Sequence, residues 1–188
     1  MFTDPLAGYL AGERGRQTPM GSWIMVPRTR FGDELVKRRY DGEPFPTPSL
    51  GTPKTCTPPL PRARQLVLLG AGLDARAFRL EGVPELSVFE VDQHELFHYK
   101  EPLLEREEIR RRFPLKVKRR VVVGDDFAGP DVGAGPAVGN GTGVAGRAGP
   151  AGGAQEARLS WERSLLRAGF DASVPSVFLL EGLLMYLP

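Results

Sequence analysis

Short apolar runs alternate along this chain with segments whose apolar residues recur at helical spacing. Four runs have the composition of buried strands, at residues 66–69, 86–92, 121–123 and 177–180. Helical spacing follows at 93–113 and 161–168, and a helix can also begin a few residues after Gly72. This alternation predicts an α/β fold, a parallel sheet with flanking helices joined by right-handed crossovers.

The segments outside this alternation predict helices and long loops within one domain, 1–188. A helix is expected over 28–40, with Pro27 in its first turn, where proline is tolerated. Residues 41–63 are rich in proline and are predicted to form a loop. Residues 128–157 are nearly all Gly, Ala, Pro and Val, so we expect a flexible insertion that cannot bury a core. Pro102 should kink or interrupt the helix over 93–113.

A glycine-rich turn follows the first predicted strand. Gly70 and Gly72 allow a tight bend and a close ligand approach, and the small Ala75 allows the next helix to pack closely. The second strand ends at Asp92, about 20 residues on, where nucleotide-binding folds place a carboxylate for ribose. Glu90 is a second acid on the same strand, and its role is left open. Together these features predict a nucleoside-containing cofactor, of which NAD is one candidate.

Composition limits the partners and the cellular location that we expect for the protein. The 188 residues carry a net charge of only +2, which gives no indication of a nucleic-acid partner. Cys56 is the single cysteine, so no internal disulfide forms, and no apolar run is long enough to span a bilayer. We expect a soluble cytoplasmic protein with no metal site, membrane contact or partner chain. The basic run 110–120 is predicted to be solvated, and Arg76 and Arg79 to be structural ion partners.

Several motifs, in order, resemble the leucine carboxyl methyltransferase family, which uses S-adenosylmethionine. The segments that carry the resemblance are 2–7, 28–30, 68–80, 89–92, 169–171 and 181–188. The resemblance implies a partial Rossmann-like class I methyltransferase fold with about four strands present. Strands beyond Pro188 would be expected in the family, so the chain resembles a C-terminally truncated member.

The resemblance also implies a set of cofactor contacts. Gly70 and Gly72 would lie against the methionine part of S-adenosylmethionine, and Asp92 would hold the ribose. Asp126 and Phe127, after the third strand, would contact the adenine.

Further contacts are implied for the charged end of the cofactor. Arg28 would pair with the cofactor carboxylate, because a guanidinium binds carboxylates in bidentate fashion, and Glu181 would face the ammonium group. Two of these contacts have an alternative residue nearby in the sequence. Arg30 could take the role of Arg28, and Asp125 could take the role of Asp126.

The predicted function is S-adenosylmethionine-dependent O-methyl transfer to a carboxylate of a small molecule or a protein C-terminus. A carboxylate acceptor is already anionic, so positioning suffices, and we predict no catalytic acid or base. The alternatives are a truncated, non-catalytic cofactor-binding fragment and an NAD-dependent Rossmann oxidoreductase.

Overall fold

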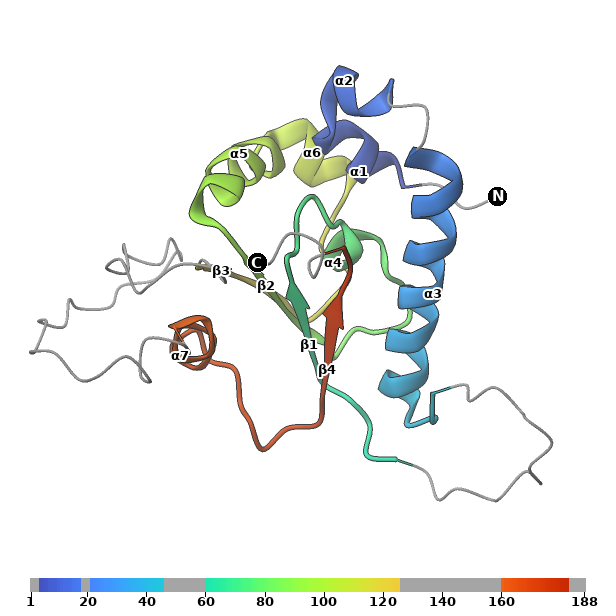
Figure 1. Ribbon diagram of the computed structural model, residues 1–188, viewed down its shortest axis with the longest axis vertical. Helices are drawn as coiled ribbons and strands as arrows, with labels where there is room; N and C mark the ends of the chain where they lie inside the picture. Colours follow the sequence, from blue (N-terminus) through green and yellow to red (C-terminus); the bar gives the residue numbers. More distant parts are fainter. Residues whose placement is uncertain (1–3, 18–20, 46–59, 126–159, 183–188) are drawn as a thin grey trace, which may run out of the picture.

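The centre of the molecule is a four-stranded sheet, shown in Figure 1. The computed structural model describes residues 4–17, 21–45, 60–125 and 160–182. The strands are β1 (Gln65–Leu69), β2 (Ser87–Asp92), β3 (Arg119–Gly124) and β4 (Ser176–Leu180). All neighbouring pairs are parallel, in the order β3-β2-β1-β4. The predicted α/β class and its four parallel strands are confirmed.

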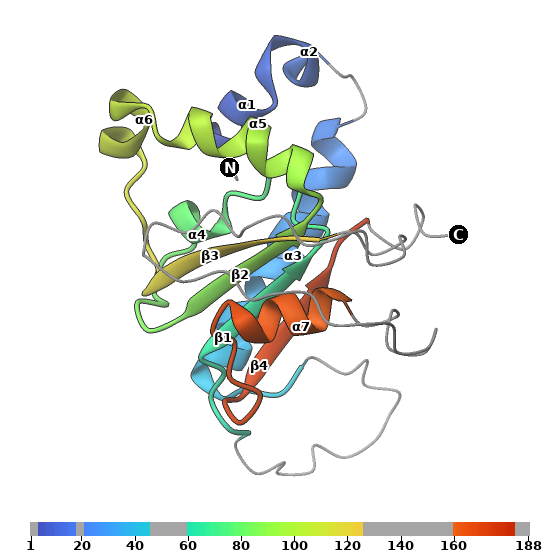
Figure 2. The same ribbon diagram turned by 90° about the vertical axis from the view of Figure 1, so that its left-hand side faces the viewer.

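Helices lie against the sheet and beyond one end of it, as Figures 1 and 2 show. They are α1 (Pro5–Leu10), α2 (Gly12–Arg16), α3 (Gly21–Asp41), α4 (Arg76–Arg79), α5 (His94–Leu104), α6 (Glu107–Arg112) and α7 (Ser160–Arg167). A first core cluster joins α3 and α4 to one face of the sheet, and a second joins α7 to the other. A third cluster joins α1 to α5 and α6.

The side chains of β1 supply both main cores. Leu66 and Leu68 point into the cluster with α3 and α4, whereas Val67 and Leu69 point into the cluster with α7. Successive residues of a strand face opposite sides of the sheet, so an uninterrupted apolar run suits a strand covered on both faces. Every residue of β1 is buried accordingly.

Two helix predictions are wrong in detail. Helix α3 begins at Gly21, so Pro27 lies inside the helix rather than in its first turn. A proline there removes one backbone hydrogen bond, which a helix of 21 residues tolerates. The helix predicted over 93–113 is two helices, and Pro102 lies inside the first. The break comes at Arg106, whose ψ of 131° leaves the helical region.

The strand order reverses between β1 and β4. From β1 the chain moves to β2 and then to β3, and the connection through α7 returns it to β4 on the other side of β1. Connections that diverge in this way leave a crevice at the carboxyl ends of β1 and β4, the two strands at the reversal, where open α/β sheets bind ligands. The predicted insertion 128–157 lies outside the described residues, as does the middle of the predicted loop 41–63.

Candidate functional site

The turn after β1 bends at two glycines with positive φ. Gly70 has a φ of 69° and Gly72 a φ of 51°, a region that side chains with a Cβ rarely adopt. The N–H groups of Gly70 and Ala71 donate to the carbonyl of Val91 at 2.9 and 3.1 Å, which ties the turn to β2. A Cβ added at Gly72 would meet nothing within 4 Å. Gly72 therefore borders open space, as the predicted close approach of a ligand requires.

A cavity of about 360 Å³ lies beside this turn, at the carboxyl ends of β1 and β4. Its wall includes the whole turn with both glycines, Arg28 of α3, Arg76 of α4 and Glu181 after β4. Segments from both ends of the chain thus meet at the point where the strand order reverses. This is the place at which a doubly wound sheet binds its ligand.

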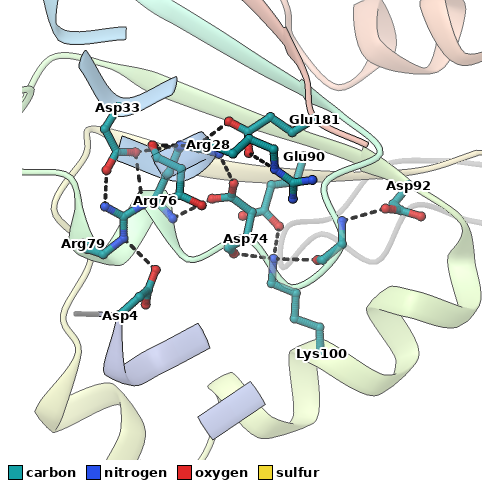
Figure 3. A network of polar contacts seen from close by, with 12 residues as sticks. Asp4, Arg28, Asp33, Asp74, Arg76, Arg79, Glu90, Asp92, Lys100 and Glu181 are labelled. Carbon is teal, nitrogen blue, oxygen red and sulfur yellow. Dashed lines mark hydrogen bonds and ion pairs between the residues drawn. The ribbon is translucent and has the colours of Figure 1, made fainter. Parts of the chain in front are cut away.

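Arg76 organises the charged part of the wall. Its side chain is only 1% exposed. Nε donates to Asp33 at 2.8 Å and Nη2 to Glu181 at 2.6 Å, and Nη1 also pairs with Asp74. Figure 3 shows these carboxylates converging on one guanidinium. We call Arg28, Asp33, Asp74, Arg76 and Glu181 the cavity cluster.

The pKa values in the cavity cluster reflect this arrangement. Burial works against the charge of Arg76, but the carboxylates of Asp74, Glu181 and Asp33 outweigh it and raise the pKa of Arg76. Burial also raises the pKa of Asp74, and the charge of Arg76 offsets this only in part. Gly32 of α3 lies so close that an added Cβ would overlap both Arg76 and Glu181. The absence of a side chain at Gly32 therefore lets this pair fit beneath α3.

Arg28 is the most exposed member of the cavity cluster. Its side chain is 36% exposed, and its Nε lies 3.5 Å from Oε2 of Glu181. That buried Nε makes no hydrogen bond within the described chain. A guanidinium and a carboxylate thus stand side by side in the cavity wall. Arg30, the competing prediction, is exposed and does not line the cavity.

Asp92 lies on the far side of the turn from Glu181 (Figure 3). Its Oδ2 accepts the N–H of Gly72 at 2.7 Å, and Oδ1 accepts the N–H of Gln93 at 2.8 Å. It does not line the cavity, but it contacts the same glycine. The N–H of Asp125 donates to the backbone carbonyl of Asp92 at 2.8 Å. Asp126 and Phe127 lie outside the described residues.

Glu90, whose role the sequence left open, is a buried ion partner rather than part of the cavity wall. Its carboxylate accepts from Lys100 at 2.7 Å and from Arg120 at 2.7 and 2.8 Å. Arg120 also binds Glu101. Burial would raise the pKa of Glu90, but the charges of Lys100 and Arg120 outweigh it, so that pKa is lowered. We call Glu90, Lys100, Glu101 and Arg120 the sheet cluster.

Sequence reasoning placed Arg120 in a solvated basic run and did not single out Lys100 or Asp33. The Arg120 prediction is wrong, because its side chain is only 8% exposed. A signal was present, since an acid in the middle of a buried strand, such as Glu90 in β2, needs a buried cation. The prediction that Arg76 and Arg79 are ion partners is confirmed.

The described residues contain neither a candidate metal site nor a helix suited to a membrane. No group of three His, Cys, Asp or Glu side chains there is placed to hold a metal ion. None of the described helices combines the length and the apolar character that crossing a bilayer requires.

Comparisons with known proteins show the family of this chain. Residues 60–188 match the family model for leucine carboxyl methyltransferase. A Streptomyces coelicolor protein is 34% identical over 128 residues, covering 66% of this chain and 30% of that protein. A Frankia alni protein is 28% identical over 204 residues, covering 100% of this chain and 52% of that protein. Both carry the name "Putative S-adenosyl-L-methionine-dependent methyltransferase". The chain thus spans about half the length, or less, of these curated relatives.

Proposed function

The chain belongs to the leucine carboxyl methyltransferase family, and from this premise we propose that it binds S-adenosylmethionine beside Gly72 and transfers its methyl group to a carboxylate. The observation that carries the proposal is the pairing of Arg28 and Glu181 in the cavity wall, 3.5 Å apart. The amino acid end of the cofactor carries a carboxylate and an ammonium group. A guanidinium beside a carboxylate is the complementary arrangement.

The residues of the cavity support this fit in two further ways. The Arg28 side chain is 36% exposed, so its guanidinium keeps N–H donors that a ligand carboxylate can reach. The open space at Gly72 admits a ligand close to the backbone. Asp92 is already fixed by the N–H of Gly72, and each carboxylate oxygen keeps acceptor capacity for a ribose hydroxyl.

The proposed reaction needs no general acid or base from the protein. S-adenosylmethionine supplies a methyl group on a sulfonium, and a carboxylate oxygen accepts it as the carbon–sulfur bond breaks and sulfur keeps the electron pair. Because the acceptor is anionic and no proton moves, the chain has only to hold the reactants in line and exclude water. Arg76 contributes by holding Glu181 in place through a hydrogen bond. Glu181 in turn would orient S-adenosylmethionine by pairing with the ammonium group of that cofactor.

Isothermal titration of the chain with S-adenosylhomocysteine, and separately with NAD, tests the cofactor. We expect binding of the first and none of the second. Tight binding of NAD alone would identify the oxidoreductase alternative. A folded chain that binds neither would overturn the proposal.

Methyl transfer needs a second assay, because a cofactor-binding chain without activity is the remaining alternative. Labelled S-adenosylmethionine is incubated with the chain and mixed carboxylic acids or peptides with free C-termini. A product that releases methanol in mild base is a methyl ester, as a carboxylate acceptor requires. Label that resists base would place the methyl group elsewhere, and cofactor binding without any labelled product would favour the non-catalytic alternative.

A further inference from the structure

Lys100 approaches the glycine-rich turn from α5, as Figure 3 shows. Its side chain is completely buried, and its ammonium donates to Glu90 at 2.7 Å. It also donates to two carbonyls of the turn, those of Gly72 at 3.2 Å and Asp74 at 2.7 Å. An ammonium buried in this way is stable only when its donors are satisfied. Here two of the three acceptors are backbone groups of the candidate site.

These two carbonyls fix the direction of two N–H groups. A trans peptide unit is planar, with its C=O and N–H pointing in opposite directions. The carbonyls of Gly72 and Asp74 point at Lys100, so the N–H groups of Leu73 and Ala75 point away from it. Leu73 and Ala75 both line the cavity, whereas Lys100 does not. The ammonium thus holds the turn with backbone donors directed away from the protein interior.

Gly72 is held from two directions. Its N–H donates to Asp92 at 2.7 Å, and its carbonyl accepts from Lys100 at 3.2 Å. Its positive φ makes this residue easy to rearrange when such contacts are lost, because glycine has many accessible conformations. The contact with Lys100 therefore adds order where a ligand would meet the backbone.

Arg120 provides an internal comparison. It binds the same carboxylate, Glu90, through Nε at 2.7 Å and Nη2 at 2.8 Å. Its other guanidinium hydrogen bonds go to Glu101 of α5, not to the turn. Lys100 and Arg120 thus pair with the same carboxylate, Lys100 through one hydrogen bond and Arg120 through two, and only Lys100 contacts the turn.

We propose that Lys100 is a positioning residue, whose ammonium fixes the Gly72 and Asp74 carbonyls so that the turn presents its backbone N–H groups to the cofactor. The part that concerns the cofactor rests on the proposed function. Lys100 touches neither the cavity nor a reacting atom, so it acts through the backbone alone. The preorganised turn then binds its ligand without a further ordering cost.

Two double variants separate this role from ordinary stabilisation. Glu90→Gln with Lys100→Met removes both ion pairs of Glu90 and the two hydrogen bonds of Lys100 to the turn. Glu90→Gln with Arg120→Met removes both ion pairs of Glu90 and the pair of Arg120 with Glu101, and it leaves the hydrogen bonds of Lys100 to the turn. Both are compared by urea denaturation, by titration with S-adenosylhomocysteine and by hydrogen exchange of the amides of residues 70–76.

The Lys100 double variant is expected to bind S-adenosylhomocysteine about tenfold more weakly than the parent chain and to exchange the turn amides about tenfold faster. The Arg120 double variant should stay within about threefold of the parent chain in ligand affinity and in exchange of the turn amides. This should hold even if its urea midpoint falls as much as that of the Lys100 double variant. Equal changes in the two variants, or no change in either, would overturn the inference.

Hydrogen exchange is measured without ligand, so it separates this inference from the proposed function. A parent chain that binds no S-adenosylhomocysteine overturns the proposed function, while the exchange contrast still decides whether Lys100 holds the turn. If the Lys100 double variant does not fold, the single variant Lys100→Gln replaces it. That side chain keeps amide donors with a shorter reach, and unchanged exchange of its turn amides would refute the positioning role.

Discussion

Two groups of charged residues meet the glycine-rich turn, and they differ in how completely their charges are matched. The sheet cluster has two carboxylates and two cations, and its short contacts lie between 2.7 and 3.0 Å. The cavity cluster has three carboxylates and two guanidiniums, and Arg79 adjoins it by pairing with Asp33 and Asp4, so four carboxylates meet three guanidiniums. The contacts of the first cluster are all made within the described chain. The second has an excess of negative charge and a guanidinium, Arg28, that is 36% exposed, as expected of a wall that receives a ligand with a cationic centre.

Two acids near the glycine-rich turn show the same difference. Burial would raise the pKa of Glu90, but the charges of Lys100 and Arg120 outweigh it and lower that pKa. Burial raises the pKa of Asp74, and the charges of Arg76 and Lys100 offset this only in part. Two nearby cations therefore hold Glu90 ionised, whereas two nearby cations do not fully offset the burial of Asp74 beside the cavity.

The most severe test of the comparison is removal of the central cation of the cavity cluster. Arg76→Met leaves Asp33, Asp74 and Glu181 close together without the guanidinium that all three share. We expect the free energy of unfolding, measured in urea, to fall by about 3 to 5 kcal/mol. Arg79→Met is the control and should cost less, because Arg79 is more exposed and Asp33 keeps Arg76. A loss below about 1 kcal/mol in Arg76→Met would show that Arg76 does not organise the cluster.

A smaller effect is expected for Glu90→Gln in the sheet cluster, about 2 kcal/mol at pH 7, because Lys100 keeps two carbonyl acceptors and Arg120 keeps Glu101. The effect depends on pH. The folded-state pKa of Glu90 lies below its ordinary value of 4.5, so its stabilising contribution is complete above that pH.

As the pH falls from 4.5 through the lowered pKa, the Glu90 contribution is lost, and the gap between the parent chain and Glu90→Gln should close. Urea midpoints of both chains between pH 3 and pH 7 measure this gap. A gap that stays constant over that range would mean that Glu90 is not held ionised by its two cations.

A third effect concerns ligand affinity more than stability. Arg28→Gln should weaken S-adenosylhomocysteine binding about tenfold, equivalent to about 1.4 kcal/mol, because the partner for the ligand carboxylate is lost. The unfolding free energy should change by less than about 1 kcal/mol, since Arg28 is partly exposed. Arg30→Gln, two residues along the same helix, is the matched control with unchanged affinity. The opposite ranking would reinstate Arg30 as the cofactor contact.

The smallest effect is expected far from both clusters. Arg111 pairs with Glu107 across one turn of α6, and both side chains are more than three-quarters exposed. Arg111→Ala should change the unfolding free energy by less than about 0.5 kcal/mol. A larger loss in thermal or urea unfolding would show that geometry alone does not rank these ion pairs, and the comparison of the two clusters would lose its basis.

The features predicted from sequence are those with a local cause. The uniform apolar run of β1 indicates a strand buried on both faces, and Gly70 and Gly72 mark the turn because few other residues adopt its backbone angles. The helix boundaries were less accurate. A proline is a weak boundary signal once tertiary packing stabilises the helix around it, as Pro27 and Pro102 show.

The charged partners could not be predicted individually, because their pairing depends on tertiary structure. Arg76 and Asp33 are 43 positions apart, and the chain has 25 Lys and Arg and 23 Asp and Glu residues from which to choose. The sequence did indicate that Arg76 has an ionic partner, but not which one. The alternation of residues along β2 also could not show that Glu90 pairs with Lys100 of α5 and Arg120 of β3 instead of lining the cavity.

Gly32 lies in a segment that precedes residues 60–188, the part matched by the family model. The same early helix brings Asp33 to Arg76 and Arg28 to Glu181. A recombinant fragment cut at the boundary of the matched region would keep the glycine-rich turn but lose one side of the cavity. The boundary of the sequence match is therefore a poor guide to the smallest fragment that can form this cavity.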